Sequence, residues 1–136
     1  MPSPIIVQKL DSVARCIERI EAKRPGSIEV LRGNADIQDI LMLNLERLVQ
    51  LCVDIAGILI TEKGLKPVPA TMAEAFVVLA QNGLIDNALR DRLVKAVGFR
   101  NIAVHEYDKI NWEIVFKIVT RHIDEFKAFA RLLEKL

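Results

Sequence analysis

The sequence predicts an all-α protein, an up-and-down bundle of about five helices that forms a single domain over residues 1–136. Three observations indicate this fold. The chain has 136 residues, of which 51% are hydrophobic and 27% charged, and these proportions are typical of one soluble domain. Only 5% of the residues are aromatic, so the core is expected to be aliphatic. Apolar residues recur at spacings of three and four along most of the chain, and no strand is required anywhere.

Composition also indicates the cellular compartment in which the protein is expected to act. The two cysteines, Cys16 and Cys52, fall on apolar helical faces and are expected to be free, buried thiols, which favours a reducing compartment. No apolar stretch approaches the roughly 20 residues needed to cross a bilayer. The first residues lack the basic start and the apolar core of a signal peptide. We therefore expect a cytoplasmic protein without a membrane partner, whose net charge of +1 leaves nucleic acid open as a ligand.

The first two helices follow from the spacing of aliphatic residues. A helix over residues 5–23 is predicted by an apolar stripe made of Ile6, Leu10, Val13, Ile17 and Ile20. Pro25 and Gly26 end this helix. The next helix begins anywhere between Ser27 and Asn34, because both residues are suitable N-caps.

That second helix is expected to be the central one. Its apolar face runs from Ile37 to Leu59 and is wide enough to be buried on two sides. Gly64 and the two prolines within residues 66–69 end it, because proline removes backbone donors and fixes an extended path.

Three further N-caps divide the rest of the chain. Thr71 and Glu74 form a capping box at the start of a short helix. Asp86 is expected to cap a helix that continues to His105, and Asn111 to cap the last helix. The apolar stripe of that last helix comprises Val115, Ile118, Val119, Ile123, Phe126, Phe129, Ala130 and Leu133. This stripe is expected to close the bundle.

One short segment, residues 98–108, concentrates polar side chains that could do chemistry. The chain has no glycine-rich phosphate loop, no paired cysteines and only two histidines, so neither a metal site nor a cofactor is predicted. Cleavage of a phosphodiester by internal attack needs a group that moves protons near neutral pH and a cation that stabilises the charge growing on phosphorus. His105 and Arg100 suit these two roles.

The spacing of these two residues poses a geometric problem. Side chains five residues apart on a helix point about 140° away from each other, whereas Asn101 and His105, four residues apart, share a face. Either a bend at Gly98 turns Arg100 toward His105, or two copies of the segment meet in a symmetric dimer and form one groove. We favour the dimer.

The order Arg100, four residues, His105, one residue, Tyr107 resembles the Arg-X4-His-X-Tyr motif of the HEPN superfamily. The similarity extends over nearly the whole chain. The run Gly-Phe-Arg-Asn-Ile-Ala-Val-His-Glu-Tyr-Asp at 98–108, the Pro-Val-Pro-Ala-Thr loop at 67–71 and the five-helix layout together resemble the HepT toxin family. This combination is much more specific than the short motif.

The resemblance implies a metal-independent endoribonuclease toxin whose active groove forms in a homodimer. It also implies an RNA substrate and a minimal nucleotidyltransferase antitoxin of the MntA kind as partner. Arg100 and His105 would be catalytic, Asn101 would assist them, and Tyr107 would be the residue to which the antitoxin attaches AMP. Added AMP would bring negative charge and bulk within two residues of the catalytic histidine and would repel an RNA phosphate.

Other interpretations of the same residues remain open. A non-catalytic module could use the motif to bind RNA or a nucleotide and to dock a nucleotidyltransferase, and a structural adaptor would not use it at all. His122 keeps step with the apolar residues of the last helix and is expected to be a core or interface histidine. Arg90, Arg92 and Lys95 lie upstream of the motif on the same helix and are candidates for steering phosphate.

Overall fold

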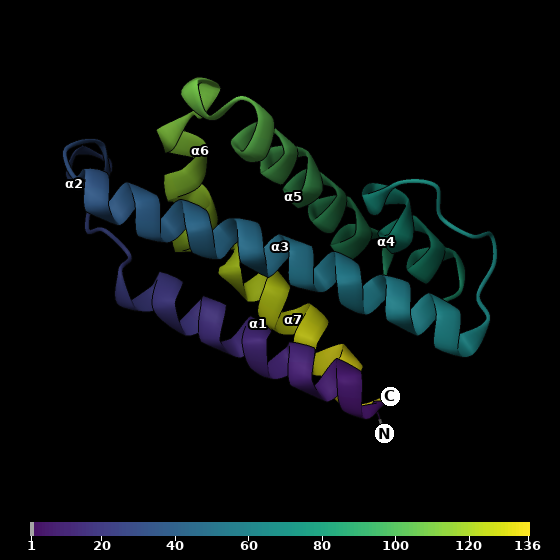
Figure 1. Cartoon of the computed structure of the whole chain (residues 1–136). Coiled ribbons are helices and arrows are strands. Elements are labelled where there is room, and N and C mark those ends of the chain that lie inside the picture. Colours follow the sequence, from purple (N-terminus) through teal and green to yellow (C-terminus); the bar gives the residue numbers. More distant parts are fainter. Residues whose placement is uncertain (1) are drawn as a thin grey trace.

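The computed structural model describes residues 2–136, and all the regular secondary structure in that range is helical (Figure 1). They are α1 (Pro4–Ala22), α2 (Ile28–Arg32), α3 (Ala35–Lys63), α4 (Met72–Gln81), α5 (Asn87–His105), the 3-10 turn η1 (Tyr107–Lys109), α6 (Trp112–Lys117), the π-helical turn η2 (Ile118–His122) and α7 (Ile123–Glu134). The segments α6, η2 and α7 follow one another without a break, so five principal helical segments form the bundle, and α2 is a short addition. The predicted all-α bundle is confirmed.

Side-chain caps fix where the second helical region begins. Both of the residues considered as N-caps are used. The hydroxyl of Ser27 accepts a hydrogen bond from the Val30 amide at 3.3 Å and starts α2. The side-chain oxygen of Asn34 accepts one from the Ile37 amide at 3.0 Å and starts α3. Two helices therefore begin where the sequence predicted one.

The remaining N-caps lie at the predicted positions. In the capping box, the Thr71 hydroxyl accepts a hydrogen bond from the Glu74 amide at 3.2 Å. The Glu74 carboxylate reaches back one residue further than expected and accepts from the Ala70 amide at 2.8 Å. Asp86 caps α5 and Asn111 caps α6 through hydrogen bonds from the amides that follow them. Local sequence therefore specifies the start of each of these helices.

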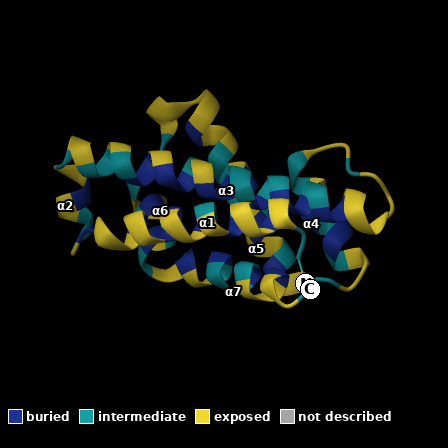
Figure 2. Cartoon of the chain, turned by 60° about the horizontal axis from the view of Figure 1, so that its bottom comes forward, coloured by how far each residue is buried: buried dark blue, intermediate teal, exposed yellow. Residues whose placement is uncertain are grey.

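The long helix α3 is the centre of the bundle, as predicted. It crosses the molecule in Figure 1 with α1 on one side and α5 on the other. Figure 2 shows buried residues on the inner sides of the long helices and exposed residues on their outer sides. Cys16 of α1 and Cys52 of α3 are buried free thiols, as expected, and burial raises the pKa of both. Among residues 2–136, no helix combines the length and apolar character that a bilayer crossing requires.

The last helical segment differs from the regular α-helix expected there. A π-helical turn, η2, separates α6 from α7. The buried residues Val115, Val119 and Ile123 are spaced by four, and each step of four overshoots an α-helical turn by about 40°. A π-helical turn contains more residues than an α-helical turn, so η2 compensates for these two steps and Ile123 again faces the core. Where such a turn inserts, the regular 3.6-residue pattern no longer predicts which way a neighbouring side chain points.

Helix α5 changes character along its length. Leu89, Leu93 and Val97 are buried and hold its first eleven residues against the bundle. In residues 98–105 only Ala103 is buried. In Figure 1 this end of α5 and the following turn η1 lie at the edge of the bundle farthest from α1. The segment singled out from the sequence is therefore presented to solvent.

Candidate functional site at the end of helix α5

The residues of the predicted site lie on the last two turns of α5 and on η1. Arg100 and Asn101 precede the end of the helix, His105 is its last residue, and Tyr107 begins η1. His105 is exposed and has no hydrogen-bond or ion-pair partner within residues 2–136. An exposed imidazole without a partner is available to a ligand that approaches from outside the chain.

Arg100 does not point at His105. Its guanidinium Nη1 lies 3.9 Å from the sulfur of Met72 at the start of α4 and donates a hydrogen bond to the side-chain oxygen of Asn101 at 3.4 Å. Its Nε is buried without a hydrogen-bond partner within the described chain. No hydrogen bond joins Arg100 or Asn101 to His105. A single copy of the chain therefore holds the arginine against α4 and leaves the histidine alone.

Gly98 does not interrupt helix α5. Helix α5 is continuous from Asn87 to His105 and passes through Gly98. A methyl group at Gly98 would meet nothing outside its own helix within 4 Å, so this glycine is not a point of close approach either. Within the single chain, Gly98 therefore does not turn Arg100 toward His105.

Tyr107 makes a contact that sequence analysis did not find. Its hydroxyl lies 3.4 Å from the Oδ1 of Asp39 on α3, and its ring meets Trp112 edge to face with centroids 6.3 Å apart. Burial raises the pKa of Tyr107, and the charge and hydrogen bond of Asp39 and the charge of Glu46 raise it further. The phenol is therefore protonated at neutral pH. Asp39 lies 68 residues from Tyr107 in sequence, and no local pattern connects them.

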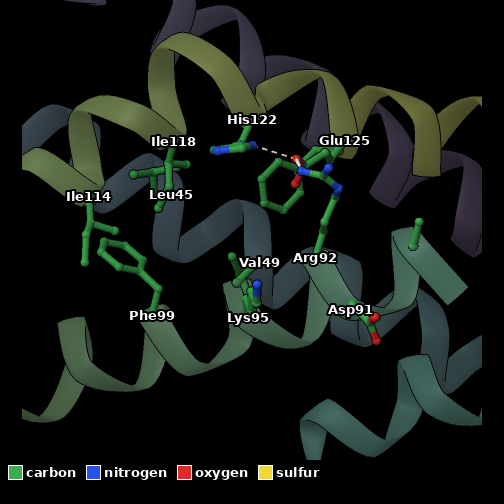
Figure 3. A pocket seen from close by; sticks show the side chains of 13 residues that line it. Leu45, Val49, Asp91, Arg92, Lys95, Phe99, Ile114, Ile118, His122 and Glu125 are labelled. Atoms are coloured by element: carbon green, nitrogen blue, oxygen red, sulfur yellow. Dashed lines mark hydrogen bonds and ion pairs between the residues drawn. The ribbon is translucent and has the colours of Figure 1, made fainter.

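A groove of about 510 Å³ runs between α5 and the α6–η2–α7 segment (Figure 3). It is lined by Leu45, Val49, Ala88, Asp91, Arg92, Lys95, Ala96, Phe99, Ile114, Ile118, His122, Glu125 and Phe126. The carboxylate oxygen Oε1 of Glu125 lies 2.6 Å from Arg92 Nη1 and 2.7 Å from His122 Nδ1. The His122 side chain lines this groove and is 39% exposed, so it is not a core histidine, and the alternative of an interface histidine stays a prediction.

Two of the three arginine and lysine residues considered for steering phosphate are already neutralised. Arg90 pairs with Asp91 at 2.8 Å, and Arg92 pairs with Glu125. Lys95 alone has no ion-pair partner within residues 2–136. A neutralised guanidinium attracts phosphate weakly, because a new anion must compete with the bound carboxylate. Of the three, Lys95 is the one that could attract a phosphate without displacing a bound carboxylate.

Comparison with known proteins decides the family. A family model described as ribonuclease HepT-like matches residues 13–133, which is most of the chain. The chain belongs to the ribonuclease HepT-like family. The mRNA nuclease HepT of Shewanella oneidensis is 37% identical over 130 residues, and the alignment covers 96% of each chain. The resemblance to HepT toxins inferred from the motif is therefore confirmed.

Solved structures agree with this assignment. The chain is 36% identical to a tri-AMPylated HEPN toxin of Shewanella oneidensis in complex with an MNT antitoxin, with a TM-score of 0.92 and coverage of 98% and 99% of the two chains. It is 36% identical to a chain of a toxin–antitoxin complex with AMP-PNP, with a TM-score of 0.89 and coverage of 96% and 98%. The cytosolic protein YutE of Bacillus subtilis, 13% identical with a TM-score of 0.76 and coverage of 94% and 87%, shares the fold.

Proposed function

We propose that this HepT-like protein is the toxin of a toxin–antitoxin pair. It cleaves cellular RNA as an endoribonuclease without a metal ion, and a nucleotidyltransferase antitoxin silences it by attaching AMP to Tyr107. The observation that carries the proposal is the complete motif of Arg100, His105 and Tyr107 at the end of α5 and the start of η1, with His105 and Tyr107 exposed, in a chain 37% identical to an mRNA nuclease. The cytoplasm, where RNA and a soluble antitoxin meet, is the proposed place of action.

The chemistry requires two roles, and the motif supplies both. His105 takes the proton from a ribose 2′-hydroxyl as its oxygen attacks the adjacent phosphorus, and a proton is returned to the 5′-oxygen that leaves. Arg100 stabilises the negative charge that grows on the phosphate oxygens, which is why no metal ion is invoked. Asn101 orients one of these side chains, and its hydrogen bond to Arg100 supports that role.

A homodimer would complete this site. The single chain keeps the Arg100 guanidinium against Met72 and away from His105, so a second copy is needed to form a groove that contains both groups. Exposed apolar side chains beside the motif suit such a contact. Ile102 is 44% and Ile114 47% exposed, and a partner that covers them would remove apolar surface from water.

The position of Tyr107 suits both modification and silencing. The residue is 45% exposed at the edge of the bundle, where another protein can reach it. AMP attached there would place a phosphate two residues from His105, and like charge would repel an RNA backbone.

The direct test is incubation of the purified, unmodified protein with total RNA in EDTA, followed by a denaturing gel. His105→Ala is compared with His122→Ala, which removes the chain's other histidine. We expect discrete fragments from the wild type and from the His122 variant, and none from the His105 variant. Intact mass confirms that each chain carries no AMP. Cleavage retained by His105→Ala would contradict the mechanism.

A second function is favoured by one observation, the separation of Arg100 from His105 in the single chain. A binding module would hold RNA or a nucleotide on these side chains and dock the nucleotidyltransferase without cutting. In that case the unmodified wild type would leave the RNA intact and bind it in a salt-dependent way.

A further inference from the structure

Asp39 is the only hydrogen-bond partner of the Tyr107 hydroxyl within residues 2–136. The phenolic oxygen lies 3.4 Å from the Asp39 Oδ1, and the two residues belong to different elements, η1 and α3. The Asp39 carboxylate is exposed and makes no other hydrogen bond or ion pair within the described chain. A free carboxylate in contact with a hydroxyl can both orient it and accept its proton.

The rest of the Tyr107 side chain is fixed as well. Its ring packs edge to face on Trp112, at an interplanar angle of 73°. The η1 backbone is closed by a hydrogen bond from the Ile110 amide to the Tyr107 carbonyl at 3.2 Å. The hydroxyl is thus presented from a defined position although 45% of the residue is exposed.

The charges around Tyr107 oppose its ionisation. Burial and the negative charges of Asp39 and Glu46 on α3 raise the pKa of the phenol. In its own turn, Lys109 is paired with Glu106 at 3.2 Å, and Trp112 brings no charge. At neutral pH the protonated hydroxyl therefore needs a base that takes its proton as it reacts, and Asp39 is the carboxylate that contacts it.

We propose that Asp39 positions the Tyr107 hydroxyl and accepts its proton during AMP transfer. The phenolic oxygen attacks the α-phosphorus of a nucleoside triphosphate held by the antitoxin, and a new oxygen–phosphorus bond forms. The bond from the α-phosphorus to the oxygen bridging the β-phosphorus breaks, and pyrophosphate leaves with the electron pair. The proton passes to the Asp39 carboxylate. This inference rests on the proposed modification of Tyr107, and it makes the toxin a participant in its own silencing.

A purely structural tether between η1 and α3 would produce the same contact, and three substitutions separate the two roles. Asp39→Asn keeps an oxygen that can accept the hydrogen bond but is not a base. Asp39→Ala removes both functions. Glu46→Gln is the matched control, because it removes a nearby negative charge from the same helix without touching the hydroxyl. Asp39→Asn and Glu46→Gln each remove a negative charge that raises the pKa of Tyr107. If charge were the only effect of these residues, both variants would be modified faster than the wild type.

The experiment measures AMP incorporation by intact mass over time, using the unmodified toxin, its cognate nucleotidyltransferase and magnesium ATP between pH 6 and 10. We expect Asp39→Asn and Asp39→Ala to be slower by about a hundredfold at pH 7 and to recover as the phenol ionises at high pH. Glu46→Gln should match or exceed the wild type. RNA cleavage by each unmodified variant is recorded in parallel and should persist.

Two outcomes would overturn the inference. Asp39→Asn modified at the wild-type rate throughout the pH range would show that no proton passes to this residue. Loss in the alanine variant alone would show a tether. Tyr107→Phe tests the underlying proposal separately, because AMP incorporated into that variant would place the modification elsewhere whatever Asp39 does.

Discussion

The two halves of helix α5 differ in how far their side chains are buried in the bundle. In residues 87–97 the apolar side chains of Leu89, Leu93 and Val97 are buried against neighbouring helices. In residues 98–105 only Ala103 is buried, Asn101 and His105 are exposed, and Arg100 is half-buried against Met72. The first half anchors the helix, and the second half carries the functional groups on that anchor.

This division separates stability from function. Buried apolar side chains contribute to folding free energy through the surface they remove from water, whereas exposed side chains contribute little. Residues 98–105 can therefore be specialised for chemistry without loss of the fold. Substitutions in the two halves should produce different classes of defect.

The largest expected effect on folding lies in the first half. Leu93 is 1% exposed, and Leu93→Ala should lower the free energy of unfolding by about 2–5 kcal/mol because it leaves a cavity in the core. Ile102→Ala, nine positions along the same helix, should change it by less than about 0.5 kcal/mol. Urea unfolding of both variants measures the difference. Equal losses would show that the second half is also anchored.

Arg100 is half-buried although it lies in residues 98–105, the exposed half of α5. Its substitution therefore tests whether this residue serves function or stability. Arg100→Met should reduce RNA cleavage by about 10²–10³, through loss of the group that stabilises charge on phosphate. It should lower the free energy of unfolding by less than about 1 kcal/mol. The buried Nε has no hydrogen-bond partner to lose, the hydrogen bond to Asn101 is exposed and long at 3.4 Å, and methionine packs well beside Met72. An RNA gel and urea unfolding test the two parts. A loss of more than about 1 kcal/mol in the free energy of unfolding would show that Arg100 stabilises the fold, as the buried residues of the first half do.

Much of the fold could be predicted because its determinants are local. Ser27, Asn34, Thr71, Asp86 and Asn111 each cap a helix within a few residues of their own position, and aliphatic spacing places the buried faces. The π-helical turn was missed, because it depends on how the last segment meets the core rather than on any residue type.

The candidate site could be predicted in outline and not in geometry. Spacing and resemblance placed Arg100 and His105 at the end of one helix, and the five-residue interval correctly indicated that they diverge. The direction of the Arg100 side chain depends on Met72, and that of the Tyr107 hydroxyl on Asp39. Both contacts join segments far apart in the chain, and periodicity cannot reveal them.

A smaller effect than that of Leu93→Ala is expected at the start of α4, the helix that packs on α5. Thr71 caps α4 beside Met72, against which Arg100 rests, and α4 packs on α5. Thr71→Ala should cost about 1 kcal/mol of stability through the lost cap, measured by urea unfolding, and Thr71→Ser should restore it. Cleavage should stay near wild type, because the cap stabilises α4 and not the Arg100 side chain itself. A fall in cleavage with the alanine variant alone would instead show that the start of α4 positions Arg100, and the two halves of α5 would then be coupled through it.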